Sequence, residues 1–171
     1  GIGLSCISIA AAYGKGNLRL SDVRVGVVKR LGSRDVFYSI KGKGAWCNGS
    51  PAKTSGRKRL SEAMVDMDLV GFKDEKMRSS CLNLLKFIRD YRRLGANALA
   101  LSFVSNGSLD CAIDLRGKLR VVDYAAAQLI VREAGGEIFD RDIYLLGDER
   151  VSYVAASTKE LLDEVLNLIA I

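Results

Sequence analysis

The chain has 171 residues, of which 49% are hydrophobic and 27% charged, a composition that excludes an intrinsically disordered protein. It contains no histidine, which excludes a Ser-His-Asp triad, and its four cysteines form no Cys-x-x-Cys pair, which argues against structural zinc. The net charge of +6 favours anionic partners, which include nucleic acid, acidic lipid and phosphorylated small molecules. The scattered basic residues with few interleaved aromatics argue against nucleic acid.

The first part of the chain predicts an antiparallel meander. Apolar, β-capable runs occupy residues 3–12, 23–28 and 35–40, and the segment 14–17 between the first two is a strong turn signal. The pair Asn48-Gly49 favours a tight hairpin turn after the third run. We therefore expect residues 1–60 to form the strands of an N-terminal subdomain.

From residue 61 the pattern alternates between strands and helices. Strands are expected at 63–69, 109–115 and 151–156, with a short extended segment at 137–140. Helices are expected at 74–90, from 95–98 to about 106–107, and after a capping box at 157–160, while 116–120 reads as a basic loop. This alternation predicts layered α/β packing for residues 61–171, with the boundary between subdomains near 58–62.

The most distinctive stretch is residues 121–136. Asp123 closes a β-branched run and precedes an almost wholly apolar helical segment, 124–131, which the pair Gly135-Gly136 ends. Asp123 alone has two interpretations. It is a helix N-cap, or it is a ligand-binding or metal-binding carboxylate at the mouth of a buried helix that follows a strand.

Four segments together resemble the inositol monophosphatase family. Residues 41–49 (KGKGAWCNG) resemble its KGKGA-x-x-NG hairpin, and residues 93–98 (RLGANA) its R-x-x-G-(S/A)-x-A segment. Residues 107–110 (GSLD) resemble its G-x-L-D strand entry, and 122–136 contain D-x-A-A followed by E-A-G-G. Each piece is weak alone, but their order and spacing make the resemblance strong over nearly the whole chain.

The resemblance implies an α/β layered sandwich of the sugar-phosphatase type and a Mg²⁺-dependent phosphomonoester hydrolase. It implies that Asp123 is a metal ligand, in a site that holds two or three Mg²⁺ ions in intact members. Gly95, Ala96 and Asn97, at a helix start, are expected to bind substrate oxygens, and close packing of two backbones is the alternative for Gly95 and Ala96. The resemblance also implies a homodimer. Reduced thiols and the lack of an apolar run long enough to span a membrane agree with a cytoplasmic protein without membrane partners.

One position resembles the archaeal members that act on both inositol monophosphate and fructose 1,6-bisphosphate. Many family members have an acidic residue seven positions before the signature Asp, where it contacts inositol; this chain has Arg116. The fork of an arginine matches phosphate oxygens, so Arg116, with Lys118, is expected to bind a second phosphate. A solvated loop is the alternative for both residues.

The family's remaining catalytic motifs precede the region that this chain matches. They are a Glu on an N-terminal helix and an Asp-Pro-(Leu/Ile)-Asp-Gly-(Ser/Thr) segment, and we expect the N-terminal helical layer and first strands to be missing with them. Since Mg²⁺ needs several convergent oxygens, the 171 residues alone are expected to be inactive. The chain is then either most of a phosphatase or a non-catalytic remnant that dimerises or binds phosphorylated ligands.

Overall fold

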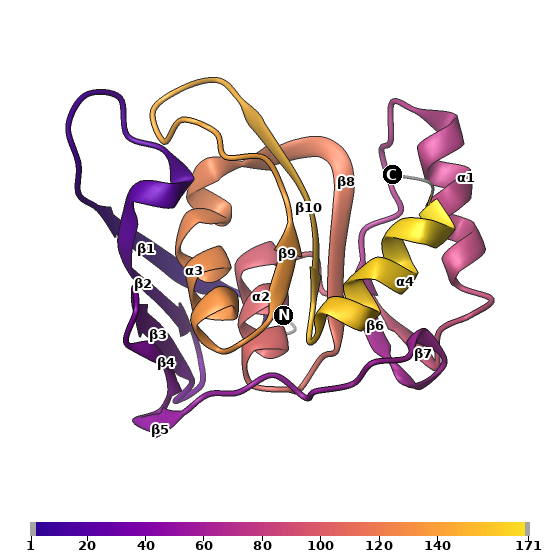
Figure 1. Cartoon of the computed structure of the whole chain (residues 1–171), viewed down its shortest axis with the longest axis horizontal. Coiled ribbons are helices and arrows are strands. Elements are labelled where there is room, and N and C mark those ends of the chain that lie inside the picture. Colours follow the sequence, from indigo (N-terminus) through magenta and orange to yellow (C-terminus); the bar gives the residue numbers. More distant parts are fainter. Residues whose placement is uncertain (1–2, 170–171) are drawn as a thin grey trace.

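Two five-stranded sheets and two pairs of helices form alternating layers in the computed structural model, which describes residues 3–169 (Figure 1). From left to right in Figure 1, the first sheet is followed by helices α2 and α3, then by the second sheet, then by α1 and α4. The predicted α/β layered sandwich is confirmed, and the N-terminal half of the chain supplies the first sheet.

The first sheet is an antiparallel meander in the order β1-β2-β3-β4-β5. Its turn between β4 and β5 contains Asn48 and Gly49 with φ angles of 54° and 83°, the left-handed pair that the sequence predicts. The strands are β1 (Cys6–Ala12), β2 (Val23–Arg30), β3 (Val36–Ile40), β4 (Gly44–Cys47) and β5 (Ser50–Pro51), with a 3₁₀ turn η1 (Leu20–Asp22) before β2.

The second sheet is mixed, in the order β7-β6-β8-β10-β9. β6 lies parallel to both β7 and β8, whereas β10 is antiparallel to β8 and β9. The strands are β6 (Met64–Met67), β7 (Asp90–Arg92), β8 (Cys111–Arg120), β9 (Glu137–Phe139) and β10 (Arg150–Ala156), and a 3₁₀ turn η2 (Leu60–Glu62) precedes β6.

Helices α2 (Asn97–Ser105) and α3 (Ala125–Glu133) fill the space between the sheets, and α1 (Glu75–Leu84) and α4 (Lys159–Ile169) cover the other face of the second sheet. Residues 125–131 of α3 are all buried, as an apolar segment without a polar face predicts. The approach of α3 to β2 is very close: a Cβ placed on Gly26 would lie 2.5 Å from the carbonyl oxygen of Ala126. The absence of a side chain at Gly26 is therefore what sets the spacing of these two layers.

The other face of the first sheet carries a row of apolar side chains. Cross-strand pairing sets Ile9 beside Val27, Val27 beside Tyr38, and Tyr38 beside Trp46, and the last two rings stack at 5.5 Å. Ile9 is 61% exposed, and no helix or strand among residues 3–169 covers this face. β1 is also the edge strand of the sheet, so its outer backbone groups have no strand partner in the described chain.

Three local predictions are wrong. The helix expected at 74–90 ends at Leu84, because the backbone N–H groups of Arg89 and Asp90 bond to Ala63 and draw the segment into β7. The expected basic loop at 116–120 is part of β8, and it bulges opposite Ser152, where the pairing with β10 shifts.

The third wrong prediction concerns Asp123 as a helix cap. Asp123 ends a 3₁₀ turn, η3 (Val121–Asp123), and the residue at the N-cap of α3 is Tyr124, which makes no side-chain capping bond. The expected glycine end of α3 is present, with Gly135 at φ 87°. α4 begins at the predicted capping box, but Thr158, not Ser157, accepts a helix N–H, that of Leu161. Asp74 also caps α1. The division into subdomains at residue 60 stays an interpretation. Of the described helices, none has the length and apolar character needed to cross a membrane.

Candidate functional site

A cavity of about 370 Å³ between the first sheet and the second brings together four of the six residues predicted for the site. Asp123 enters from η3, and Gly95, Ala96 and Asn97 enter from the start of α2. The other lining residues come from β1, α2, the end of β8 and η3: Cys6, Ser8, Ala98, Leu119 and Val122. Residues that are far apart in sequence thus form one pocket, which we call the Asp123 pocket.

The Asp123 carboxylate is exposed and has no hydrogen-bond or ion-pair partner among residues 3–169. Its charge acts on the neighbouring Cys6, whose thiol pKa is raised first by burial and then by Asp123. A carboxylate that neither caps a helix nor pairs with a cation keeps all its lone pairs available for a ligand. This is what a metal ligand requires.

Backbone donors at the start of α2 line the same pocket. Gly95 adopts a left-handed φ of 66°, which turns the chain into the helix. The N–H groups of Ala96, Asn97 and Ala98 find no acceptor in the part of the chain that the structure describes, whereas Leu99 and Ala100 already bond to the carbonyl of Ala96. Unpaired donors at a helix start favour an anionic or oxygen-rich ligand.

A buried acidic network holds the loop that leads to these donors. The Asp66 carboxylate, 6% exposed, accepts the Leu94 N–H at 2.7 Å, and Asp68 accepts the Arg93 Nε at 2.8 Å. The pKa of Asp66 is raised to about 6, chiefly by burial; the Leu94 N–H and Arg93 lower this pKa, and the charges of Asp68 and Asp114 raise it. The loop from Arg93 to Gly95 is thereby tied to the end of β6.

Arg116 belongs to that network. Its Nε and Nη2 bind the two oxygens of Asp114 at 3.0 and 2.7 Å, and Nη1 lies 2.7 Å from Asp68 and 3.3 Å from the carbonyl of Val70. Four of the five guanidinium N–H donors are used by these contacts. Arg116 and the exposed Lys118 do not line the Asp123 pocket, so a phosphate contact by either residue stays a prediction.

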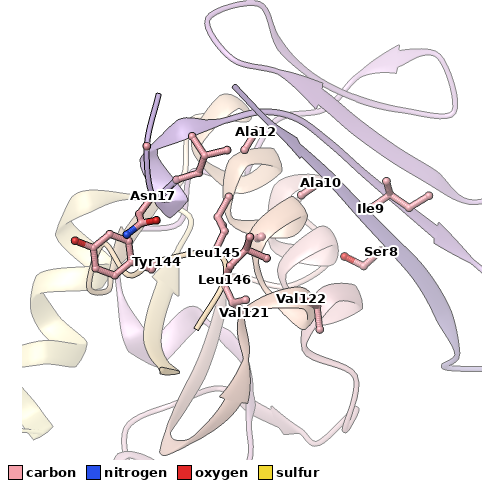
Figure 2. Close-up of a pocket in the computed structure, with 13 residues that line it drawn as sticks. Ser8, Ile9, Ala10, Ala12, Asn17, Val121, Val122, Tyr144, Leu145 and Leu146 are labelled. Carbon is pink, nitrogen blue, oxygen red and sulfur yellow. The ribbon is translucent and has the colours of Figure 1, made fainter. Parts of the chain in front are cut away.

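A larger, mostly apolar cavity of about 570 Å³ adjoins the Asp123 pocket and shares Ser8 and Val122 with it. Figure 2 shows its walls: Val121 and Val122 of η3, Leu145 and Leu146 of the loop before β10, and Ser8, Ile9, Ala10 and Ala12 of β1. It contains no carboxylate, and Leu146 is 96% exposed at its mouth. The carboxylate of Asp123 thus lies in the smaller cavity.

Sequence reasoning missed the contribution of β1. Cys6 and Ser8 face the Asp123 pocket, and the Ser8 Oγ is buried without a hydrogen-bond partner in residues 3–169. An unpaired buried hydroxyl calls for a water or a ligand group. The available signal was the strand alternation, since Cys6, Ser8, Ala10 and Ala12 put small side chains on one face while Ile7 and Ile9 take the other.

A family model described as the inositol monophosphatase family matches residues 1–170. The chain belongs to the inositol monophosphatase family. It is 34% identical over 157 residues to a fructose-1,6-bisphosphatase/inositol-1-monophosphatase of Methanothermobacter thermautotrophicus, a match that covers 89% of this chain and 55% of that protein. It is also 34% identical over 131 residues, 74% of this chain, to a bifunctional NADP phosphatase/NAD kinase of Methanococcus maripaludis, covering 22% of that protein.

Among solved structures, Mycobacterium tuberculosis SuhB superimposes with a TM-score of 0.77 at 27% identity, over 96% of this chain and 63% of that one. The chain thus spans a little over half the length of the archaeal phosphatase that it matches.

Two family motifs meet in this fold. The carboxylate of Glu133, from the E-A-G-G segment, accepts the N–H groups of Gly42 and Gly44 of the K-G-K-G-A hairpin at 2.7 and 2.8 Å. Gly42 and Gly44 have φ angles of 74° and 101°, which expose both N–H groups to one acceptor. In this inositol monophosphatase family member, the two motifs therefore hold the first sheet to α3 and do not enter the Asp123 pocket.

Proposed function

We propose that this chain supplies one side of the active site of a Mg²⁺-dependent phosphomonoester hydrolase. Asp123 is the metal ligand, and Gly95, Ala96 and Asn97 bind substrate oxygens. The observation that supports this most directly is the unpaired Asp123 carboxylate in the same pocket as the unpaired N–H groups of α2. Bound Mg²⁺ would supply an activated water and charge neutralisation at the phosphate.

The described residues do not by themselves make a Mg²⁺ site. Within residues 3–169, no three acidic, cysteine or histidine side chains are grouped so as to hold a metal ion. One carboxylate is too few, since Mg²⁺ takes an octahedral set of oxygens. Activity therefore requires further carboxylates, and the family pattern assigns them to the Glu and Asp-x-x-Asp motifs that precede the matched region. Asp123 would then be one ligand in a site for two or three ions.

The substrate is proposed as inositol monophosphate, fructose 1,6-bisphosphate or both. The name of the archaeal relative supports this class, while the relative named as an NADP phosphatase keeps a phosphorylated nucleotide as a further substrate to assay. A second phosphate bound by Arg116 would have to displace Asp114 from the guanidinium fork, whereas Lys118 is free to turn toward a ligand.

The alternative is a non-catalytic remnant that dimerises or binds phosphorylated ligands. The uncovered apolar face of the first sheet favours it in one respect, because soluble monomers rarely expose such a face and a partner copy would cover it. The mass of the purified natural protein separates the two: about 18.6 kDa supports the remnant, and a clearly larger mass supports additional residues.

The deciding experiment is phosphate release with Mg²⁺ from inositol 1-phosphate and fructose 1,6-bisphosphate by the natural full-length protein. We expect Asp123→Asn to lower kcat/KM on the order of a hundredfold or more, because the variant weakens a direct metal ligand. Asp148→Asn is the matched control, since Asp148 is exposed and outside the pocket. A wild type that hydrolyses none of the esters, or an Asp123→Asn protein with full activity, would refute the proposal.

A further inference from the structure

Tyr153 lies directly behind the Asp123 pocket and reaches it through one contact. Its ring is fully buried on β10 and stacks on Tyr124 with a centroid distance of 5.1 Å. Its hydroxyl donates to the Asn97 Oδ1 at 2.8 Å, and Asn97 is the first residue of α2 and lines the pocket. Asn97 belongs to the R-x-x-G-(S/A)-x-A segment, whereas Tyr153 lies outside the family motifs described above.

The phenol proton fixes which way the Asn97 carboxamide points. Burial raises the pKa of Tyr153 well above its ordinary value, and the charges of Asp114 and Asp66 raise it further, so the hydroxyl keeps its proton at every working pH. With the amide reversed, Nδ2 would donate to the hydroxyl and the buried phenol proton would lose its acceptor. The bond is therefore satisfied only with Oδ1 toward Tyr153.

This orientation leaves the Nδ2 group of Asn97 as a free donor. It has no acceptor among residues 3–169, and Asn97 is only partly buried. The backbone N–H groups of Ala96, Asn97 and Ala98, unpaired within residues 3–169, belong to residues that line the same pocket. This wall consequently offers donors only, and a ligand that fits it must present acceptor oxygens.

We propose that Tyr153 is a positioning residue that holds the Asn97 side chain with its Nδ2–H toward a phosphoryl or hydroxyl oxygen of the bound phosphate ester. Asn97 is then a specificity-determining side-chain donor in addition to its backbone contact. The inference rests on the proposed function for the identity of the ligand, and on the Tyr153–Asn97 bond for the geometry.

The kinetic test uses the full-length protein and a double-mutant cycle of Tyr153→Phe and Asn97→Ala. Each variant should raise KM for inositol 1-phosphate roughly three- to tenfold, the effect of one neutral hydrogen bond, with kcat within about twofold of wild type. Because Tyr153 acts through Asn97, Tyr153→Phe should have no further effect on KM in the Asn97→Ala background. Asn97→Asp removes the donor and should be worse than Asn97→Ala.

Tyr124→Phe is the matched control, since it removes a buried phenol hydroxyl, bonded to Asp140, from the ring stacked on Tyr153. It should lower the melting temperature without changing KM. If Tyr153 has only a packing role, Tyr153→Phe will behave like Tyr124→Phe, or its effect on KM will persist in the Asn97→Ala background. Either result overturns the proposal.

A binding measurement separates this inference from the proposed function. In a ¹⁵N-labelled protein, inorganic phosphate should shift the Nδ2–H₂ resonances of Asn97 in wild type, and Tyr153→Phe should weaken the apparent phosphate affinity about threefold or more. Unshifted resonances at saturating phosphate would overturn the inference even in an active enzyme. If the resonances shift but the protein hydrolyses no ester, this inference is supported and the proposed phosphatase activity is refuted.

Discussion

Gly26 sets the distance between the first sheet and α3. Its missing side chain lets the backbone of β2 approach Ala126, and a Cβ there would lie 2.5 Å from the Ala126 carbonyl oxygen and 3.1 Å from its Cα. Both atoms belong to the backbone of a buried helix, which has no free volume to move into. The position therefore excludes every residue except glycine without a shift of a whole layer.

We expect Gly26→Ala to lower the free energy of unfolding by about 2–4 kcal/mol, because one extra methyl group forces β2 and α3 apart. Urea denaturation followed by circular dichroism measures this. Gly147→Ala is the control, since a Cβ at Gly147 meets no atom within 4 Å. Equal stability of the two variants would show that the layers separate at little cost.

Asp66 makes stability depend on pH in a direction opposite to that of most carboxylates. Its folded pKa of about 6 exceeds its ordinary value of 3.8, so the folded state favours the protonated form. Stability from this group is complete below pH 3.8 and is lost as pH rises through 6. The difference in pKa corresponds to about 3 kcal/mol at most.

In the Asp66→Asn variant the side chain stays neutral while its oxygen still accepts the Leu94 N–H. We therefore expect the unfolding free energy of Asp66→Asn, minus that of wild type, to increase between pH 4 and pH 7.5 by up to about 3 kcal/mol. Urea titrations at several pH values measure this difference. A difference that does not change with pH would mean that Asp66 is not the titrating group.

At the level of elements, Glu133 joins the end of α3 to the hairpin before β4. Its two oxygens accept the N–H groups of Gly42 and Gly44, which precede Glu133 by 91 and 89 positions in the chain. Hydrogen bonds to a charged acceptor are stronger than neutral ones, and this pair also fixes where the first sheet sits along the helix.

Glu133→Ala should destabilise the protein by about 1–3 kcal/mol, because the N–H groups of Gly42 and Gly44 lose a charged acceptor. Thermal unfolding monitored by circular dichroism measures the loss. Glu137→Ala removes an equal charge from an exposed position that has no side-chain partner in the described chain, and it should be close to neutral. If both variants unfold like wild type, the Glu133 contacts do not contribute to stability.

Elements with local signals were predictable from the sequence, and those decided by distant contacts were not. The Asn48-Gly49 turn and the Gly135 end of α3 depend on residues next to them, and both are present. The end of α1 depends on the Ala63 carbonyl, which accepts the N–H groups of Arg89 and Asp90. These bonds draw the segment into β7 although its sequence has a helical pattern. The extension of β8 likewise depends on its pairing with β10.

The candidate site likewise combines residues that the sequence predicts with contacts that depend on distant parts of the chain. The family pattern brought Asp123 and residues 95–97 into consideration, and the fold places them in one pocket. Asp114 lies two residues from Arg116 in β8, but nothing in the sequence near Arg116 shows that Asp68 also binds its guanidinium, because that contact depends on the register of β6 and β8. Tyr153 was missed for the same reason, since its partner lies 56 residues away.

At the scale of the whole molecule, the sheets are covered unequally by the described residues. α1 and α4 cover the outer face of the second sheet, whereas the corresponding face of the first sheet presents Ile9, Val27, Tyr38 and Trp46 without a helical layer. The larger apolar cavity opens beside the same edge strand, β1 (Figure 2). This cavity adjoins the Asp123 pocket, whereas the uncovered row lies on the opposite face of the first sheet.

The stacked Tyr38–Trp46 pair has a spectroscopic consequence. Trp46 is the only tryptophan of the chain, and it lies at the end of the uncovered row. Its fluorescence therefore reports on one surface alone. Anything that settles on that surface, whether a further segment of the same protein or a second copy, will shield the indole from water and from added quencher. Trp46 fluorescence will therefore detect any segment or second copy that covers this face of the first sheet.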